Sequence, residues 1–454
     1  MSLLNLQGKS LHRYAHRVAR FHGKKDAELG VSKTELSVIV QASMMGISKS
    51  AKALQVLQAE HAQLPVEDIA ARTLELFCSH DISLAAVLCS GYENDRYSDL
   101  LLSQHDAKKL AERVRVLNGQ KEKIAHTQIE KLGGGYRDIW SFGRVRYAQQ
   151  VALAWIIEAL APTNPYDFSL PGRGGIHGAA KAIGLALEQG HRFVVTADGK
   201  NAFPSVKKEH LALVCSLHEQ LTDYVCFPVL PFNPDALVVL SPNVSISLSL
   251  LDESNTEAKA APCQLPQGAA HSSLVLSALT GGCLSQLKGN IVIIVYADNI
   301  AICAHTREEA QNAMETLRKA LGSLSAGPLL LHDIQLRDGW LHDGKFLEAG
   351  KPPVYGAVEF CGYRISRDQY DGDIRYRPSR KSFAAFRRKL RHEIFKPWMT
   401  DDEMFEAGMK SGQAWRRGFP LWNDTGEYVE FNVVTEMQDT KDWWAYLAWQ
   451  KKSA

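Results

Sequence analysis

The stretch Ile291–Thr306, IVIIVYADNIAICAHT, sets a carboxylate between two apolar runs. Each run has the length and the β-branched composition of a strand, so the polar residues between them predict a tight hairpin. Asp298 would lie at the tip of this hairpin, with Asn299 beside it. An Asp at the end of a strand is often only a turn residue, but it can also be a ligand that a rigid sheet holds in place.

The composition of the 454-residue chain is that of a globular protein, with 45% hydrophobic and 22% charged residues. The net charge is only +2, so any basic surface for nucleic acid must be local. The eight cysteines form no Cys-x-x-Cys pair, which argues against a zinc ribbon or a disulfide framework and predicts a reducing cytoplasmic location. No apolar run reaches the roughly 18–20 residues of a membrane span, so no membrane partner is expected.

Periodicity divides the chain into three regions. Residues 1–125 have the amphipathic pattern of helices and predict a helical N-terminal region. Residues 126–366 alternate strand-like and helical segments, which predicts an α+β domain with a short antiparallel sheet. Strand-like alternation marks 236–251, and Val358–Ser366 is predicted to be the last strand of this domain. Residues 367–454 are first basic and then rich in tryptophan, and predict a third, helical subdomain.

A second carboxylate stands one hundred residues before Asp298. Asp198 ends the apolar strand in FVVTADGKNAF. If the two strands are neighbours in one sheet, the two carboxylates meet and offer the oxygen ligands that Mg²⁺ prefers. Two ions about 3.5–4 Å apart could activate an attacking 3′-oxygen and stabilise a leaving pyrophosphate. Either Asp alone is weak support for a catalytic site.

The order of five segments strengthens this interpretation. They are LPGRGGIHGAAKAI from Leu170, ADGKNAFPSV from Ala197, LPQGAAHSS from Leu265, YADN from Tyr296 and FCGYRIS from Phe360. In this order they resemble the motifs of reverse transcriptases, specifically the bacterial group that includes group II intron and defence-associated enzymes. The resemblance covers about half of the chain. It implies a right-hand polymerase of fingers, palm and thumb, with an antiparallel palm sheet.

The resemblance also implies roles for individual residues. Asp198, Asp298 and Asn299 would be catalytic, with Asp198 and Asp298 holding two Mg²⁺ ions, or Mn²⁺ in their place. Phe203 falls at the position of the aromatic steric gate that selects deoxynucleotides, and is alternatively a core residue. The remaining assignments are Gln267, Gly268, Arg137 and Lys131 at the nucleotide, Gly362 and Tyr363 in the primer grip, and Arg380, Lys381, Arg387 and Arg388 on nucleic acid. The cations are alternatively solvated surface charges, and the primer-grip pair an ordinary hairpin.

Two departures from the family pattern affect the expected chemistry. Most relatives have Asp-Asp where this chain has Asp298-Asn299. An Asn keeps an oxygen ligand but removes one negative charge, which weakens a metal site without abolishing it. Because the other motif residues are present, we expect an active site. His332 stands near the usual position of a lysine, and is either a loop residue or an acid for the leaving pyrophosphate.

The expected function is that of a reverse transcriptase, making DNA from dNTPs on a structured non-coding RNA in bacterial antiphage defence. A homo-oligomer or a second reverse transcriptase is a further possible partner. Two alternatives remain open at the level of the sequence. One is DNA synthesis that is untemplated, protein-templated or protein-primed. The other is a non-catalytic RNA-binding subunit.

Overall fold

The computed structural model describes most of the chain. It leaves out residues 1, 5, 94–101, 118–121, 123, 131–135, 162–163, 209–210, 213–214, 229–263, 342–343, 348–352, 423–426 and 454. Lys131 and the strand-like segment 236–251 therefore lie outside the described residues, and the predictions for them stay untested.

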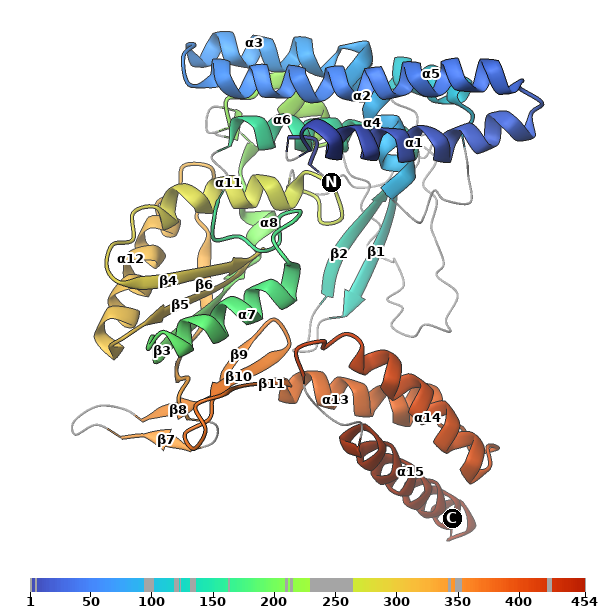
Figure 1. Ribbon diagram of the computed structural model, residues 1–454. Helices are drawn as coiled ribbons and strands as arrows, with labels where there is room; N and C mark the ends of the chain where they lie inside the picture. Colours follow the sequence, from blue (N-terminus) through green and yellow to red (C-terminus); the bar gives the residue numbers. More distant parts are fainter. Residues whose placement is uncertain are drawn as a thin grey trace.

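The N-terminal region is helical, as the sequence predicts. It consists of α1 (Gly8–Glu28), α2 (Lys33–His61), α3 (Val66–Phe77), α4 (His80–Glu93) and α5 (Gln104–Val114). The helix α2 begins at a capping box in which Ser32 and Glu35 satisfy each other's backbone N–H groups. These helices share one core with α6 (Arg144–Leu160), and they form a layer across the top of the molecule in Figure 1. In the described part of the chain no single helix is long and apolar enough to cross a membrane, whereas the bent pair α3–α4 passes by length and composition only.

A two-stranded antiparallel hairpin, β1 (Ile124–Glu130) and β2 (Tyr136–Phe142), connects the helical layer to α6. Its buried Ile124, Trp140 and Phe142 pack with Ala269 of the LPQGAAHSS segment. The hairpin therefore places one predicted motif beside another that lies far away in the sequence.

The central sheet has six strands in the order β4-β5-β3-β6-β8-β7. Their bounds are β3 (Phe193–Lys200), β4 (Ile291–Tyr296), β5 (Asn299–Ala304), β6 (Leu330–Asp338), β7 (Lys345–Phe346) and β8 (Val354–Gly356). The strands β3, β4 and β5, which carry the two catalytic motifs, pair in antiparallel fashion with one another and with β6, as predicted. The prediction of a wholly antiparallel sheet is wrong at one place, because β6 and β8 run parallel.

Both faces of this sheet are covered, which explains why the Ile291–Thr306 hairpin is apolar almost throughout. Val195, Ile293 and Ile302 face α11 (Ser272–Leu284) and α12 (Arg307–Gly322). The alternate residues Val194, Ile294 and Cys303 face α7 (Gly175–Glu188) and a second, three-stranded sheet. Asp198 belongs by its position in β3 to this second face.

The predicted last strand Val358–Ser366 is in fact a hairpin. Cys361 and Gly362 have φ of 47° and 84°, and this left-handed backbone reverses the chain between β9 (Val358–Phe360) and β10 (Tyr363–Arg367). A third strand, β11 (Ile374–Pro378), pairs with β10. Arg375 and Arg377 therefore lie on a strand, where the sequence predicted a helical subdomain.

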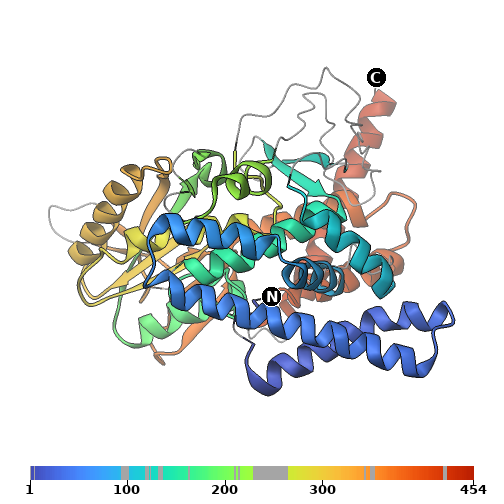
Figure 2. The same ribbon diagram turned by 90° about the horizontal axis from the view of Figure 1, so that it is seen from above.

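The C-terminal region is helical beyond β11. It contains α13 (Arg380–Lys389), the short π-helix η3 (Leu390–Ile394), α14 (Asp401–Arg416) and α15 (Glu427–Ser453). Its core is aromatic, with Trp415 stacked on Phe386 at a centroid distance of 4.5 Å. Viewed from above, α12 and α15 lie on opposite sides of the molecule (Figure 2). Three short helices, α8 (Ala202–Ser205), α10 (Glu219–Leu221) and η2 (Thr222–Cys226), complete the described structure.

Candidate active site

The fold brings the two predicted carboxylates together. In the pairing of β3 with β5, Asp198 lies opposite Asn299, and Asp298 occupies the adjoining two-residue turn. The N–H of Gly199 donates to the carbonyl oxygen of Asp298 at 2.9 Å. A side chain at position 199 would lie 3.3 Å from the Cβ of Asp298, so this glycine allows the two backbones to approach.

The environment of Asp198 disfavours its charged form. Burial, followed by the charge of Asp298, raises the pKa of Asp198, while His332 and Arg137 act in the opposite direction. Its Oδ1 is buried without a hydrogen-bond partner among the described residues. The Nε2 of His332 lies 3.7 Å from Oδ2. A carboxylate that has one buried oxygen without a donor and faces a second carboxylate has the chemistry of a cation ligand.

The described residues offer no cluster of three or more His, Cys, Asp or Glu side chains around a metal position. Two carboxylates are therefore what the described part of the chain itself brings to a cation here. This donor set fits Mg²⁺, which typically binds one or two carboxylates and takes its other ligands from water and substrate phosphates.

Residues with a strained backbone lie around the two carboxylates. Six described residues other than glycine have a positive φ, and four of them adjoin the site: Asn201, Ala297, Asp333 and Cys361. Asn201 follows β3, Ala297 precedes Asp298, Asp333 follows His332, and Cys361 lies in the β9–β10 turn. The pKa of Cys361 is raised to about 12 by burial and by the charges of Asp298 and Asp198, so this turn is close to both carboxylates. Strained backbone is typical of sites whose geometry serves function.

The β1–β2 hairpin contacts the LPQGAAHSS segment. The N–H of Trp140 donates to the carbonyl of Gln267 at 2.9 Å. Gly268 has a φ of 102°, and a side chain there would lie 2.5 Å from the carbonyl oxygen of Trp140. The buried Oε1 of Gln267 has no hydrogen-bond partner in the described structure. Arg137 is exposed on the same strand β2 and contributes to the electrostatics of Asp198.

The structure places two other predicted residues in packing positions. Phe203 lies half-buried in α8, against both large core clusters. Tyr363 is fully buried, and its hydroxyl lies 2.9 Å from Nδ1 of His177. Gly362 precedes it in the β9–β10 turn that approaches the carboxylates. Tyr363 is therefore a packing residue that holds the β9–β10 turn in place, whereas the turn itself faces the site.

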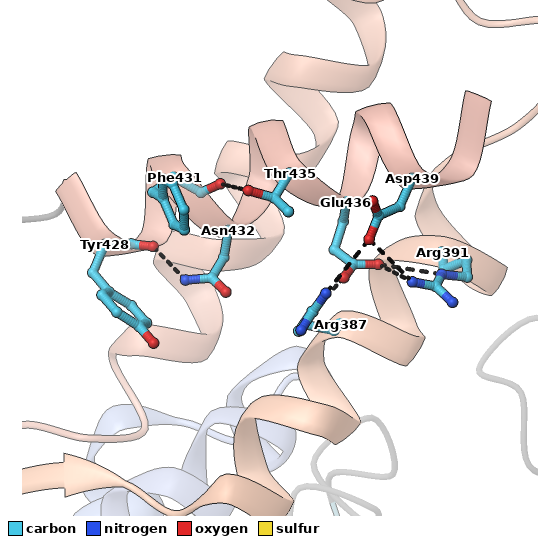
Figure 3. Close-up of polar contacts among 8 residues, drawn as sticks. All are labelled: Arg387, Arg391, Tyr428, Phe431, Asn432, Thr435, Glu436 and Asp439. Carbon is cyan, nitrogen blue, oxygen red and sulfur yellow. Dashed lines mark hydrogen bonds and ion pairs between the residues drawn. The ribbon is translucent and has the colours of Figure 1, made fainter. Parts of the chain in front are cut away.

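The predicted nucleic-acid cations fall into two groups. Arg387, with Arg391, contacts the fully buried carboxylate of Glu436, and Asp439 lies 3.6 Å from Arg387 (Figure 3). These contacts hold α13 against α15, so Arg387 has a structural partner that the sequence did not predict. The others, Arg380, Lys381 and Arg388, are exposed on α13.

His332 is the site residue whose position the sequence predicted least well. It is not in a loop but in β6, directly opposite Asp198. The sequence carried one signal for this strand, because the apolar run before His332 is long enough to continue into it. The ion pair between Arg192 and Asp338, farther along the same strands, was missed altogether, because nothing in the sequence pairs residues so far apart.

Comparison with known proteins identifies this domain. Residues 129–326 match the family model described as reverse transcriptase (RNA-dependent DNA polymerase). The chain carries a reverse transcriptase domain. The matched range includes Asp198, Asp298 and the LPQGAAHSS segment.

Among solved structures, 181 chains match. One is telomerase from Candida albicans, in complex with a fragment of telomeric RNA, at 10% sequence identity and a TM-score of 0.34. The match covers 72% of this chain, which spans 62% of the telomerase chain. No curated protein sequence matches.

Proposed function

We propose that the protein is a reverse transcriptase of the right-hand type, which synthesises DNA from dNTPs on an RNA template. In this proposal β1–β2 belong to the fingers, the six-stranded sheet is the palm, and α13–α15 form the thumb. The observation that carries the proposal is the meeting of Asp198 and Asp298 at the strained end of the sheet, within a reverse transcriptase domain. The hairpin that docks on Gln267 and Gly268 supplies the opposite wall.

Asp198 and Asp298 would hold two Mg²⁺ ions, or Mn²⁺, with Asn299 beside them. Bound there, the ions supply activation of the primer 3′-hydroxyl and charge neutralisation at the leaving pyrophosphate. In the transfer, the primer 3′-hydroxyl would lose its proton to water and its oxygen would bond to the α-phosphorus, while the bond from that phosphorus to the bridging oxygen breaks and pyrophosphate leaves. The unpartnered Asp198 Oδ1 supports this role, since it leaves one carboxylate oxygen for a cation.

The other residues would bind and orient the nucleotide. Arg137 neutralises triphosphate charge, because a guanidinium on an exposed strand can contact the phosphates in a bidentate manner. Gly268 allows the base pair to approach the backbone, and the buried Oε1 of Gln267 can accept a hydrogen bond from the nucleotide. Phe203 lies under the sugar and excludes a 2′-hydroxyl. Gly362 holds the primer end at the β9–β10 turn.

The template in this proposal is a structured non-coding RNA, and the setting is antiphage defence in a bacterial cytoplasm. Both rest on the resemblance of the five motifs to defence-associated enzymes. A homo-oligomer or a second reverse transcriptase is the proposed protein partner.

The test is to purify the protein with its bound nucleic acid, add Mg²⁺ or Mn²⁺ with each labelled dNTP, and sequence any product. Wild type and Asp198→Ala are compared side by side. A product of the wild type alone, complementary to a bound RNA, is the expected result. A simple repeat that matches no bound RNA would replace the proposal with untemplated or protein-directed synthesis. No product with either metal would favour a non-catalytic subunit.

A further inference from the structure

A cavity of ≈ 420 Å³ lies between the end of α6, the loop before α7 and one face of α11. The helices α6 and α11 lie side by side in Figure 1 and share the core of the helical layer. Most of the described wall is apolar and includes Ala161, Leu170, Pro171, Leu274 and Ala278. An apolar cavity of this size with a few polar groups in its wall is the usual form of a small-molecule site.

Two polar side chains in the wall have an atom without a hydrogen-bond partner. Asn164 and Ser277 are only 3% and 4% exposed. The Oδ1 of Asn164 accepts the N–H of Tyr166 at 3.0 Å, which leaves its Nδ2 without an acceptor among the described residues. The hydroxyl of Ser277 has no partner there either.

These two side chains lie at the same end of the cavity. A Cβ added at Gly281, one turn beyond Ser277 on α11, would lie 3.5 Å from the Cβ of Asn164. Buried polar atoms that lack partners destabilise a fold. A ligand with an acceptor oxygen would supply the partner that both donors lack.

Arg173 gives the wall a positive charge. Its Nη1 donates to the carbonyl of Pro165 at 3.2 Å, and it has no carboxylate partner in the described parts of the chain. The acidic residue of the described wall is Glu158. Burial raises the pKa of Glu158, which favours its neutral form, and the side chain of Ser2 hydrogen-bonds to it. The wall therefore matches an anion.

The other carboxylate of this loop does not line the cavity. The Oδ1 of Asp167 accepts the N–H and the hydroxyl of Ser169, at 2.8 and 2.7 Å, so this side chain orders the loop from within. Asp167 is 1% exposed. Its position leaves the charge of Arg173 for a ligand.

The charge of the wall indicates the kind of anion. One guanidinium matches one negative charge, and a carboxylate can accept about four hydrogen bonds, which is enough for Arg173, Asn164 and Ser277 together. A phosphate monoester carries a charge of about −1.5 to −2 near neutral pH and would leave part of it uncompensated beside apolar side chains. A carboxylate with an apolar body therefore fits better than a phosphate.

The loop that carries Asn164 and Arg173 is also tied to the catalytic hairpin. The carbonyl of Tyr166 accepts the N–H of Val295, and the N–H of Phe168 donates to the carbonyl of Val295, each at 2.8 Å. Val295 lies on β4, three residues before Asp298. A ligand held between this loop and α11 would restrain the segment that pairs with β4.

We propose that this cavity is a binding site for a small organic carboxylate. The carboxylate lies on Arg173 and accepts hydrogen bonds from the Nδ2 of Asn164 and the hydroxyl of Ser277. The apolar body lies against Leu170 and Leu274. Binding needs neither metal nor nucleotide, so the site can be tested independently of the proposed function.

The test titrates the full chain with 4-phenylbutyrate in EDTA and follows binding by ligand-observed NMR. For a ligand of about twelve non-hydrogen atoms we expect a Kd on the order of 1 mM. Arg173→Gln should bind about tenfold more weakly, because it loses the charged hydrogen bonds. Lys181→Gln removes the same charge from an exposed position on α7 and should bind as the wild type does.

Two variants test the other walls. Ser277→Ala should weaken binding about threefold without lowering the melting temperature, because it removes a hydroxyl that has no partner in the described structure. Ala278→Phe fills the cavity from α11 and should abolish binding. The melting temperature of each variant without ligand shows whether it is folded.

Two further compounds test the ligand class. The neutral 4-phenylbutyramide should show no binding at 10 mM, because it lacks the charge that Arg173 recognises. Phenyl phosphate should bind no more tightly than the carboxylate, and tighter binding would overturn the assignment to a carboxylate.

Hydrogen exchange places the ligand beside the loop. At 10 mM 4-phenylbutyrate, about ten times the expected Kd, the amides of Phe168 and Val295 should exchange about tenfold more slowly in the wild type and at an unchanged rate in Arg173→Gln. Three results would overturn the inference: no binding by the wild type at 10 mM, equal weakening in Arg173→Gln and Lys181→Gln, or normal binding by a folded Ala278→Phe. Asp198→Ala should bind the compound normally, so absence of DNA synthesis in the wild type would reject the proposed function alone.

Discussion

The paired strands β3 and β6 have a carboxylate at each end, and the surroundings of these two carboxylates are opposite in kind. At one end, Asp338 is fully buried and accepts hydrogen bonds from Arg192, at 2.6–2.9 Å, and from the N–H of Trp340. At the other end, Asp198 is 41% exposed at its side chain and faces Asp298. One of its oxygens has no partner among the described residues.

This difference in surroundings distinguishes a structural carboxylate from a functional one within one pair of strands. A buried carboxylate that serves the fold receives a cation and donors, because an unpaired buried charge is strongly destabilising. Asp198 receives a second carboxylate and the strained turns around Asn201, Ala297 and Cys361 instead. A protein tolerates such an arrangement where the ligand that completes it is not part of the chain.

The largest expected change in stability concerns Asp338. We expect Asp338→Ala to lower the free energy of unfolding by about 3 kcal/mol, because it leaves the Arg192 guanidinium without its buried partner. Urea denaturation measures the change. Glu406→Ala, at an exposed position on α14, is the control and should change stability by less than about 0.5 kcal/mol. Similar small losses in both variants would remove the contrast between the two ends.

A smaller effect is expected at the contact between β2 and the LPQGAAHSS segment. Gly268→Ala inserts a side chain 2.5 Å from the carbonyl of Trp140 at a φ of 102°, which should cost about 2 kcal/mol of stability and raise KM for the nucleotide. Thermal melts and steady-state extension measure the two effects. Gly282→Ala on α11, where nothing lies within 4 Å of the new atom, should leave both unchanged or stabilise slightly. A tolerated Gly268→Ala would show that this contact does not shape the site.

Asn299 places an uncharged amide beside Asp298. Its Nδ2 donates to Asp298 Oδ1 at 3.2 Å. Asn299→Asp replaces this donor by a third carboxylate, so we expect the Mg²⁺ concentration for half-maximal synthesis to fall about tenfold or less. A metal titration of the extension rate measures it, with Asn312→Asp on the exposed face of α12 as the control for net charge. An unchanged Mg²⁺ requirement would place Asn299 outside the metal site.

The smallest effect is a pH dependence of stability. Burial and Asp298 raise the pKa of Asp198, so the folded state binds a proton more readily than the unfolded chain. The stability that Asp198 contributes is therefore present at low pH and is lost as the pH rises through the raised value. Without metal, the melting temperature of the wild type should fall relative to that of Asp198→Asn as the pH rises through the raised pKa of Asp198. The fall should be about 1 °C, because the side chain is partly exposed. A constant difference between the two proteins would contradict the shift.

Much of this arrangement could be predicted from the sequence. The strand-like run before Asp198 and the hairpin around Asp298 have strong local signals, and pairing the two strands brings their ends together. The helix Arg307–Gly322 follows the same logic, because its Thr306 cap and amphipathic pattern are local.

The remaining features depend on tertiary context. The sequence offered two interpretations of Val358–Ser366, one strand or a hairpin at Gly362 and Tyr363, and it did not decide between them because a cysteine such as Cys361 rarely adopts a positive φ. The arginine partners of Asp338 and Glu436 lie 146 and at least 45 residues away, and no local pattern joins them. The position of Arg377 opposite Arg364, in the pairing of β10 with β11, depends on the register of two strands, which the intervening turn sets.

The most direct test compares the two ends in one assay, by measuring single-nucleotide extension of a DNA primer on an RNA template for wild type, Asp198→Asn and Asp338→Asn. Melting temperatures of the same samples give the folded fraction. We expect Asp198→Asn to be folded and at least about 10³-fold slower. Asp338→Asn should be less stable, with a nearly normal rate for each folded molecule. A rate of Asp198→Asn within tenfold of the wild type would contradict the assignment of the catalytic site.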